Sequence, residues 1–245
     1  MAATVPTILA TSGGFREGER TMLELGPLVH HAVELAGVDG RAPRLGYLGT
    51  AIGDQEFFAY RMGEAARVAG FAFTDIRLFS MPNHADLEET MLGLDAIWVM
   101  GGSVANLLAV WRVHGLPDML QRAWQSGVVL SGISAGSLCW FVGGTTDSFG
   151  PELRPVTNGL GYLPYANSVH HGSPGRRELI HALVADGRLP EAHCTDDGVG
   201  LVYHGTQLVE AVSETDGALA YVVRREGDRA VEEPLQPRRL KLGAS

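Results

Sequence analysis

A short segment in the middle of the chain combines features that few folds can accommodate. The apolar run at residues 128–130 leads into Gly132-Ile133-Ser134-Ala135-Gly136, which fits the pattern G-x-S-x-G, and a second apolar run follows. This order predicts a buried strand, a sharp turn that exposes a serine, and a helix, the arrangement called a nucleophile elbow. The glycines two residues before and after Ser134 permit the tight turn, so its hydroxyl should stand out toward solvent. The helix should direct its N-terminal amides at the same point, which suits a developing oxyanion.

Apolar runs alternate with helical patterns before and up to this segment. The expected strands span residues 7–11, 45–48, 73–79 and 96–100, and the expected helices span residues 22–36, 57–69, 104–113 and 116–126. Alternation of this kind predicts βαβ units and therefore a doubly wound, mostly parallel sheet in an α/β fold. Loops that follow parallel strands meet at one edge of the sheet, where ligands bind. We therefore expect Gly13-Gly14, Thr50, Gly101-Gly102 and Ser134 to converge.

The second half of the chain is less regular. Residues 143–164 are rich in Gly, Thr and Pro, which predicts a long active-site loop. A helix is expected at residues 176–186. Short strands, interpreted as antiparallel additions to the sheet edge, are expected at residues 193–195, 200–203, 208–213 and 218–223. The whole chain, residues 1–245, is expected to form a single domain in which residues 225–245 are a loosely ordered tail.

The composition argues against several classes of partner. The 245 residues have a formal net charge of -9, so neither a nucleic acid nor an acidic membrane is an expected partner. The two cysteines, Cys139 and Cys194, are too few for a disulfide framework and lie in apolar settings, which predicts buried free thiols. No signal peptide or membrane-spanning stretch is expected, which favours a cytoplasmic protein.

A serine nucleophile needs a histidine base and an acid that orients the base. His170 and His171 precede the loop at residues 172–175, and loops of this kind often carry function. Asp147 and Asp197 are both candidates for the acid, and spacing alone does not separate them. Adjacent histidines point apart and seldom share a metal, and no other spacing in the chain matches a zinc or iron site, so no metal is expected.

The oxyanion formed at an attacked carbonyl needs backbone amides as hydrogen-bond donors. Ala135 directly follows the candidate nucleophile and offers one amide. The loop Gly101-Gly102 follows the neighbouring expected strand and offers another, because glycine allows a substrate to approach closely. Ser103, next in the same loop, is a candidate substrate contact.

Several of these motifs together resemble the peptidase E family of cytoplasmic serine peptidases, which includes aspartyl dipeptidase and is related to cyanophycinase. The resemblance extends from residue 10 to residue 213. Its most specific parts are Gly101-Gly102, the segment Gly132 to Gly136, the segment Gly159-Leu160-Gly161-Tyr162-Leu163-Pro164 leading to His170, and Asp196-Asp197-Gly198. It implies a three-layer sandwich like that of class I glutamine amidotransferases, which is flavodoxin-like, with serine in place of the nucleophilic cysteine.

The resemblance also implies roles for individual residues. The catalytic histidine of the family is usually followed by an aromatic residue, and His170 occupies the histidine position with His171 in the aromatic place. The acid of the family matches either Asp147 or Asp197. Asp197 is favoured because a residue at a strand beside the His170 loop would be rigidly held, as orienting an imidazole requires, and Asp147 remains the alternative.

Departures from the family pattern bear on the substrate. The family motif Gly-Gly-Asn-Thr-aromatic is replaced here by Gly101-Gly102-Ser103-Val104-Ala105. An arginine that helps to bind the substrate's aspartate in aspartyl dipeptidases would correspond to Arg176 or Arg177, with the register shifted by about one residue. A preference for N-terminal aspartate is thus less well supported than serine hydrolysis itself.

The expected function is hydrolysis of peptide bonds in short peptides, Asp-Xaa dipeptides included, by Ser134, His170 and Asp197, in a monomer or homodimer without a cofactor. One alternative is an esterase of the α/β-hydrolase fold. It is disfavoured because His170 follows Ser134 by only 36 residues, whereas that fold places a long stretch of sheet and helix between the two. Another alternative is a catalytically silent binding or regulatory protein on the same scaffold, suggested by the altered residues after Gly102.

Overall fold

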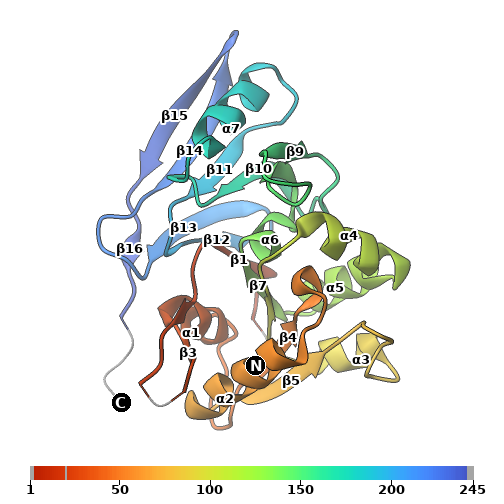
Figure 1. Ribbon diagram of the computed structural model, residues 1–245. Coiled ribbons are helices and arrows are strands. Elements are labelled where there is room, and N and C mark those ends of the chain that lie inside the picture. Colours follow the sequence, from red (N-terminus) through yellow and green to blue (C-terminus); the bar gives the residue numbers. More distant parts are fainter. Residues whose placement is uncertain (1–2, 20, 242–245) are drawn as a thin grey trace.

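A twisted eight-stranded sheet forms the centre of the molecule in the computed structural model, which describes residues 3–19 and 21–241 (Figure 1). Five adjacent strands are parallel, as expected from the βαβ pattern. In spatial order they are β1 (Thr7–Thr11), β7 (Val129–Ile133), β6 (Ala96–Val99), β4 (Arg44–Leu48) and β5 (Ala72–Ile76). Beyond β1 the sheet continues through antiparallel β12 (Val199–His204) and β13 (Gln207–Ser213), and ends at β16 (Arg238–Arg239).

Helices cover both faces of this sheet, which makes the three-layer α/β sandwich that the sequence predicts. One face packs against α1 (Pro27–Glu34) and α2 (Glu56–Val68) through one buried apolar cluster. The opposite face packs against α3 (Leu87–Leu92), α4 (Val104–Val113) and α5 (Leu116–Gln125) through another. Strand β6 is buried along its whole length because it lies between both layers, which explains its continuous apolar sequence.

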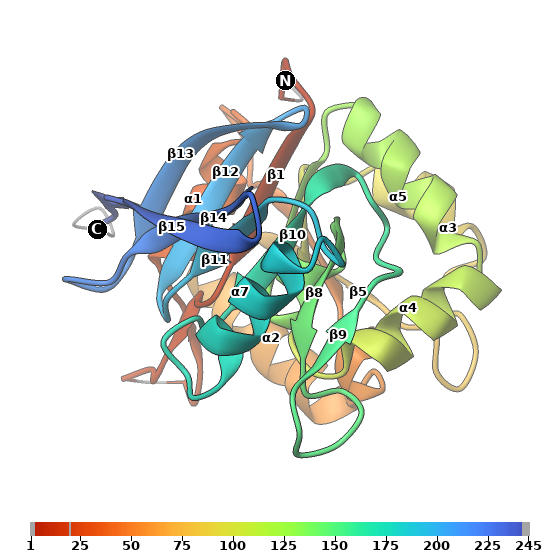
Figure 2. The same ribbon diagram turned by 90° about the horizontal axis from the view of Figure 1, so that it is seen from above.

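A second, six-stranded sheet corrects the expectation of a long loop at residues 143–164. Its strands, in spatial order, are β15 (Arg229–Leu235), β14 (Ala220–Glu226), β11 (Ala192–Thr195), β10 (Leu163–Val169), β8 (Phe141–Thr146) and β9 (Arg154–Val156). Helix α7 (Arg176–Ala185) packs on this sheet through the third apolar cluster (Figure 2). The strands at residues 192–195 and 220–226 therefore belong to the second sheet and are not additions to the edge of the first.

Other expectations need correction at their boundaries. The tail expected from residue 225 is a strand hairpin up to Leu235, because β15 pairs with β14 along its whole length. Of the residues in this expected tail, only 242–245 lie outside the described part. The first expected helix begins at Pro27, not at residue 22, and is preceded by the small hairpin of β2 (Phe15–Arg16) and β3 (Glu24–Leu25). No helix in the described ranges is long and apolar enough to cross a lipid bilayer.

Candidate active site

Ser134 lies in a strained turn between β7 and α6 (Ala135–Leu138), as the elbow pattern predicts. Its backbone has φ 57° and ψ -110°, a conformation that costs a non-glycine residue about 1–3 kcal/mol and is typical of functional positions. Its amide donates to the Thr11 carbonyl at 3.0 Å, which fixes the turn to the end of β1. The helix that follows is a single turn, shorter than the apolar run suggested, because β8 begins at Phe141.

The glycines of the elbow are required by the close approach of β6. A Cβ atom on Gly132 would lie 2.6 Å from the Val99 carbonyl oxygen, and one on Gly136 would lie 2.2 Å from the same atom. Both distances are far below van der Waals contact. The pattern G-x-S-x-G therefore lets the turn pack directly against the neighbouring strand, and the serine side chain remains half-exposed at the edge of the sheet.

The Gly101-Gly102 loop lies beside the serine, at the end of β6. A Cβ atom on Gly101 would lie 3.1 Å from the Cβ of Ser134, which shows how closely the two turns approach. Gly102 has φ +139°, and a Cβ there would lie 2.4 Å from the Ala51 carbonyl oxygen. Within the described part of the chain, the amides of Gly102 and Ala135 donate to no protein acceptor. Two backbone donors are thus available near the candidate nucleophile.

His170 follows β10 and is paired with an acid. Its Nδ1 hydrogen-bonds to Oδ1 of Asp197, which lies in the turn between β11 and β12. Because β10 and β11 are parallel neighbours, the two residues follow adjacent strand ends. His170 also has a positive φ, of 53°. The Asp197 side chain is 76% exposed, and that of His170 is 26% exposed. Between Ser134 and His170 the structure contains no direct hydrogen bond; such bonds often tighten only when a substrate binds.

Asp147, the alternative acid, is committed elsewhere. Its Oδ2 accepts from Nη2 of Arg176 at 3.2 Å, and Arg176 also donates to the Thr145 carbonyl from a buried position. Arg177 pairs with Glu232 at 3.6 Å and lies over the Tyr221 ring. The structure therefore brings Asp197, and not Asp147, to His170, and it gives both candidate substrate arginines intramolecular partners.

Ser12 connects the parts of the site and was not singled out by sequence reasoning. Its Oγ accepts the backbone N–H of His170 at 3.2 Å and lies 2.6 Å from Oγ1 of Thr195. Its carbonyl accepts the amide of Gly198, the residue after Asp197, at 3.0 Å. The only available signal was its place in the Thr-Ser-Gly-Gly turn after the first strand, where a serine has many possible roles.

Ser103 caps a helix in the structure. It is the N-cap of α4, and its hydroxyl accepts from the Asn106 amide at 3.2 Å. A hollow of about 480 Å³ lies beside this loop, lined by residues 50–53 together with Phe79 and the α4 residues Asn106, Ala109 and Val110. The hollow reaches the Gly101-Gly102 loop through Ala51, whose carbonyl accepts the Ser103 amide at 2.9 Å.

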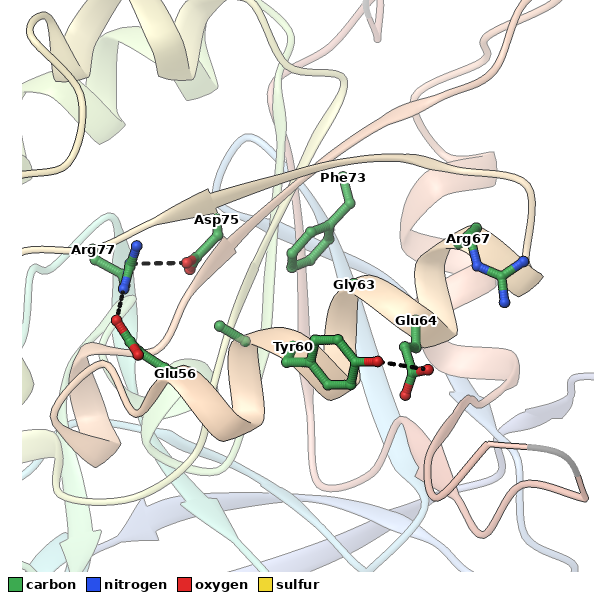
Figure 3. Close-up of a pocket in the computed structure, with 9 residues that line it drawn as sticks. Glu56, Tyr60, Gly63, Glu64, Arg67, Phe73, Asp75 and Arg77 are labelled. Carbon is green, nitrogen blue, oxygen red and sulfur yellow. Dashed lines mark hydrogen bonds and ion pairs between the residues drawn. The ribbon is translucent and has the colours of Figure 1, made fainter.

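A larger hollow, of about 560 Å³, is lined by other residues, which Figure 3 shows. It is formed by α2 and the edge strand β5. Glu56 and Asp75 both pair with Arg77 at its rim, at 2.6 and 3.0 Å, and Phe73 lies on its wall. Ser134, His170 and Asp197 take no part in its lining, so the volume of a hollow alone does not identify the candidate site.

Both cysteines are buried free thiols, as expected. Burial raises the pKa of the Cys139 thiol well above its ordinary value, and burial likewise raises that of Cys194. A thiol is a good nucleophile only as its thiolate. Neither cysteine is therefore suited to replace Ser134 as a nucleophile.

His171 points away from the candidate catalytic residues and meets two side chains that sequence spacing did not connect with it. Its Nε2 lies 2.8 Å from Oε2 of Glu232, and the same oxygen lies 2.9 Å from Nε2 of His181. These are residue types that bind transition metals. The sequence predicts no metal site here, because adjacent histidines point apart and no spacing matches a zinc or iron site. Glu232, 61 residues from His171 and on β15, is brought to it only by the fold.

A strained turn with a partly exposed serine after a central parallel strand places the molecule among the α/β enzymes that use a nucleophile elbow. Comparisons with known proteins give the family. The sequence profile of Peptidase family S51 matches residues 8–211. A relative named Uncharacterized peptidase YgaJ, from Bacillus subtilis (strain 168), is 37% identical over 194 residues, which cover 79% of this chain and 83% of the relative.

Solved structures show the same fold. A peptidase from an acI-B1 Actinobacterium superposes with a TM-score of 0.68 at 18% identity, over 97% of this chain and 96% of the other. A putative Peptidase E protein from Listeria monocytogenes EGD-e superposes with a TM-score of 0.60 at 13% identity, over 86% of this chain and all of the other. The chain belongs to peptidase family S51 as a peptidase E-like protein, and its class is that of a serine peptidase.

Proposed function

We propose that the protein hydrolyses peptide bonds in short peptides through an acyl-enzyme formed on Ser134. The observation that carries this proposal is the pairing of His170 with Asp197 beside Ser12, whose neighbour Thr11 accepts the backbone N–H of Ser134. Hydrogen bonding at Nδ1 of His170 leaves its Nε2 free to act on the serine hydroxyl. The family membership supports peptide bonds as the target.

The proposed reaction has two halves. Ser134 Oγ attacks the peptide carbonyl carbon while Nε2 of His170 takes the hydroxyl proton. The amides of Gly102 and Ala135 donate to the oxyanion, and each such donor typically contributes about 3 kcal/mol to transition-state stabilisation. The C–N bond then breaks, and His170 returns the proton to the leaving amine. Water attacks the acyl-enzyme by the same route, and the acid product and free Ser134 result.

Asp197 orients the imidazole in this proposal and stabilises its charged form. Its high exposure means that water screens the interaction, so its electrostatic contribution should be smaller than that of a buried acid. The glycine at position 198 has φ +79°, which lets the turn after Asp197 close tightly against Thr215. The tight turn should thus hold the exposed Asp197 side chain rigidly, as orienting the imidazole requires.

Short peptides are the proposed substrates, and N-terminal aspartate is one case to be tested within that class. Arg176 and Arg177 both have acidic partners inside the protein, Asp147 and Glu232 respectively. Each guanidinium is therefore already paired with a carboxylate of the protein and is not free to bind a substrate carboxylate. This arrangement favours a substrate range wider than Asp-Xaa.

The test combines a dipeptide panel with a fluorophosphonate probe that reacts with activated serines. The purified chain should cleave members of the panel and become labelled, and Ser134→Ala should do neither. Ser126→Ala, which alters an exposed serine at the end of α5, is the matched control and should behave like the unaltered protein. Labelling that persists in Ser134→Ala would refute the assignment. If the unaltered chain showed no labelling and no turnover, the result would favour a catalytically silent scaffold.

A further inference from the structure

Two histidines and one glutamate from three separate segments meet at the outer side of the second sheet. His171 lies just after β10, His181 lies on α7, and Glu232 lies on β15. Their ligand atoms all lie within 4.8 Å of one another. Glu232 is outside residues 8–211, the range that the family profile matches, so this cluster is a feature of the chain that the family likeness does not supply.

We propose that His171, His181 and Glu232 form a binding site for a divalent transition-metal ion, with Zn²⁺ as the best-suited ion. Two imidazoles with one carboxylate favour zinc and its neighbours over Mg²⁺ or Ca²⁺, which prefer all-oxygen sites. Three protein ligands leave a fourth tetrahedral position for water. The site is separate from the proposed catalytic reaction, and its existence does not depend on that reaction.

The present distances are close to those that a metal requires. Both Nε2 atoms share the same carboxylate oxygen, at 2.8 Å from His171 and 2.9 Å from His181. Around tetrahedral zinc with bonds of about 2.0–2.1 Å, neighbouring ligand atoms are about 3.3 Å apart. The two contacts with Glu232 would therefore open by about half an ångström, and the two imidazole nitrogens, now within 4.8 Å of each other, would move to a similar separation. Side-chain rotation can supply both movements, and the metal would replace the protons that now join these atoms.

The surroundings hold the ligands in place. The His171 side chain is fully buried, and Ser168 Oγ lies 3.5 Å from its Nδ1, on the side away from the carboxylate. A partner at the second ring nitrogen is the usual support for a metal-binding histidine. The His181 side chain is 31% exposed and that of Glu232 is 16% exposed, which leaves the ion a path from solvent. Arg177 at 3.6 Å from Oε1 of Glu232 keeps that carboxylate oriented.

A bound ion would tie the C-terminal hairpin to the segment that begins at His171 and continues directly into α7. It would fix the loop directly after His170, the helix α7 and the C-terminal hairpin of β14 and β15. Metal binding to the folded state alone raises stability by mass action. Zn²⁺ in large excess over its dissociation constant should therefore raise the unfolding temperature by about 5 °C or more.

The experiment uses the full-length, untagged chain after removal of metal by a chelator. Titration calorimetry with Zn²⁺, and the visible absorption of added Co²⁺, should show one tightly bound ion per chain. His181→Gln and Glu232→Gln should each weaken Zn²⁺ binding at least 100-fold and abolish the thermal shift. His204→Gln, at an exposed histidine that ends β12, is the matched control and should bind as the unaltered chain does.

Circular dichroism of each metal-free variant checks that it is folded. The two substitutions remove different ligands, so if one variant misfolds, the other still tests the proposal. Absence of stoichiometric Zn²⁺ binding in the unaltered chain would overturn the proposal. The proposal would also be overturned if folded His181→Gln or folded Glu232→Gln bound Zn²⁺ as tightly as the unaltered chain. In either case the cluster would be an internal ion pair in which Glu232 accepts from two imidazoles.

Discussion

The Ser12 hydroxyl accepts the backbone N–H of His170 at 3.2 Å, and the preceding residue, Thr11, accepts the backbone N–H of Ser134 at 3.0 Å. Two consecutive residues at the end of β1 therefore hold the candidate nucleophile and the candidate base. Both of the residues held have positive φ, 57° for Ser134 and 53° for His170. Such conformations persist only where the surroundings fix them, so the end of β1 acts as the support for both sides of the site.

Ser12→Ala should lower kcat about 10- to 100-fold and leave KM nearly unchanged. The substitution removes the acceptor for the His170 amide and the contact with Thr195, and a small displacement of a catalytic base has a large effect on rate. Steady-state kinetics with a cleaved dipeptide measures both constants. Thr7→Val, at the opposite end of the same strand, removes a comparable hydroxyl that donates to Val5, and it should leave kcat unchanged. Equal kcat values in Ser12→Ala and the unaltered chain would refute the positioning role.

Asp197→Asn should lower kcat about 100-fold, whereas Asp147→Asn should change it by less than about threefold. Asp197 accepts from Nδ1 of His170, and an amide in its place favours the wrong tautomer of the ring. The expected loss is smaller than for a buried acid because water screens Asp197. Asp147 pairs with Arg176, and the imidazole has Asp197 as its partner. The reverse order of effects in a kinetic comparison of the two variants would reassign the acid to Asp147.

Gly102→Ala should reduce kcat about 100-fold or more through loss of one oxyanion donor. The added Cβ would lie 2.4 Å from the Ala51 carbonyl oxygen, so the loop must move and carry its amide away from Ser134. Gly37→Ala is a suitable control because Gly37 also has positive φ but has open space around its Cβ position. It should lower stability by about 1 kcal/mol without affecting kcat. Thermal unfolding and kinetics on both variants separate the effect of backbone strain from the effect of losing the amide. An unchanged kcat in Gly102→Ala would exclude the Gly102 amide as an oxyanion donor.

Local sequence patterns were sufficient to predict the five parallel strands of the first sheet and the elbow. The strand at residues 7–11 and the helix at residues 104–113 have the bounds that their apolar spacing indicated. These elements follow local rules because buried parallel strands are uniformly apolar and the helices between them are amphipathic. The expected convergence of strand-end loops also appears in the structure, in the approach of Gly101 to Ser134.

The second sheet was missed because its strands break local rules for reasons that lie far away in the sequence. Gly144 belongs to β8, and a Cβ there would lie 1.8 Å from the Asn167 carbonyl oxygen on β10. A Cβ on Gly159 would similarly lie 2.0 Å from the Phe141 carbonyl oxygen. These glycines permit strands to approach closely, but in the sequence they indicate a loop. Ser12 and Glu232 were missed for the same reason, since only tertiary contacts give them roles.

An acid-dependent loss of stability should trace in part to Asp95, a buried carboxylate at the start of β6. Partial burial by itself would raise the pKa of Asp95, but hydrogen bonds from Arg41 and Arg44 outweigh that effect and hold the pKa far below its usual value. The contacts include Arg41 Nη1 to Oδ2 and Nη2 to Oδ1, both at 2.6 Å, and the Arg44 amide to Oδ2 at 2.7 Å. Because the pKa is lower in the folded state, the stabilisation is complete above about pH 4 and is lost as the pH falls below that value.

Asp95→Asn should therefore reduce the free energy of unfolding by about 2 kcal/mol at pH 7, and the difference from the unaltered chain should shrink as the pH falls from about 4 toward 2. Urea unfolding at a series of pH values measures both curves. Asp216→Asn is the matched control: Asp216 also pairs with an arginine, Arg239, at 2.6 Å, but its side chain is 90% exposed. Water and salt screen such a surface pair, so its removal should leave the stability curve nearly unchanged at every pH. A constant difference between Asp95→Asn and the unaltered chain across this range would show that the Asp95 charge does not drive the acid response.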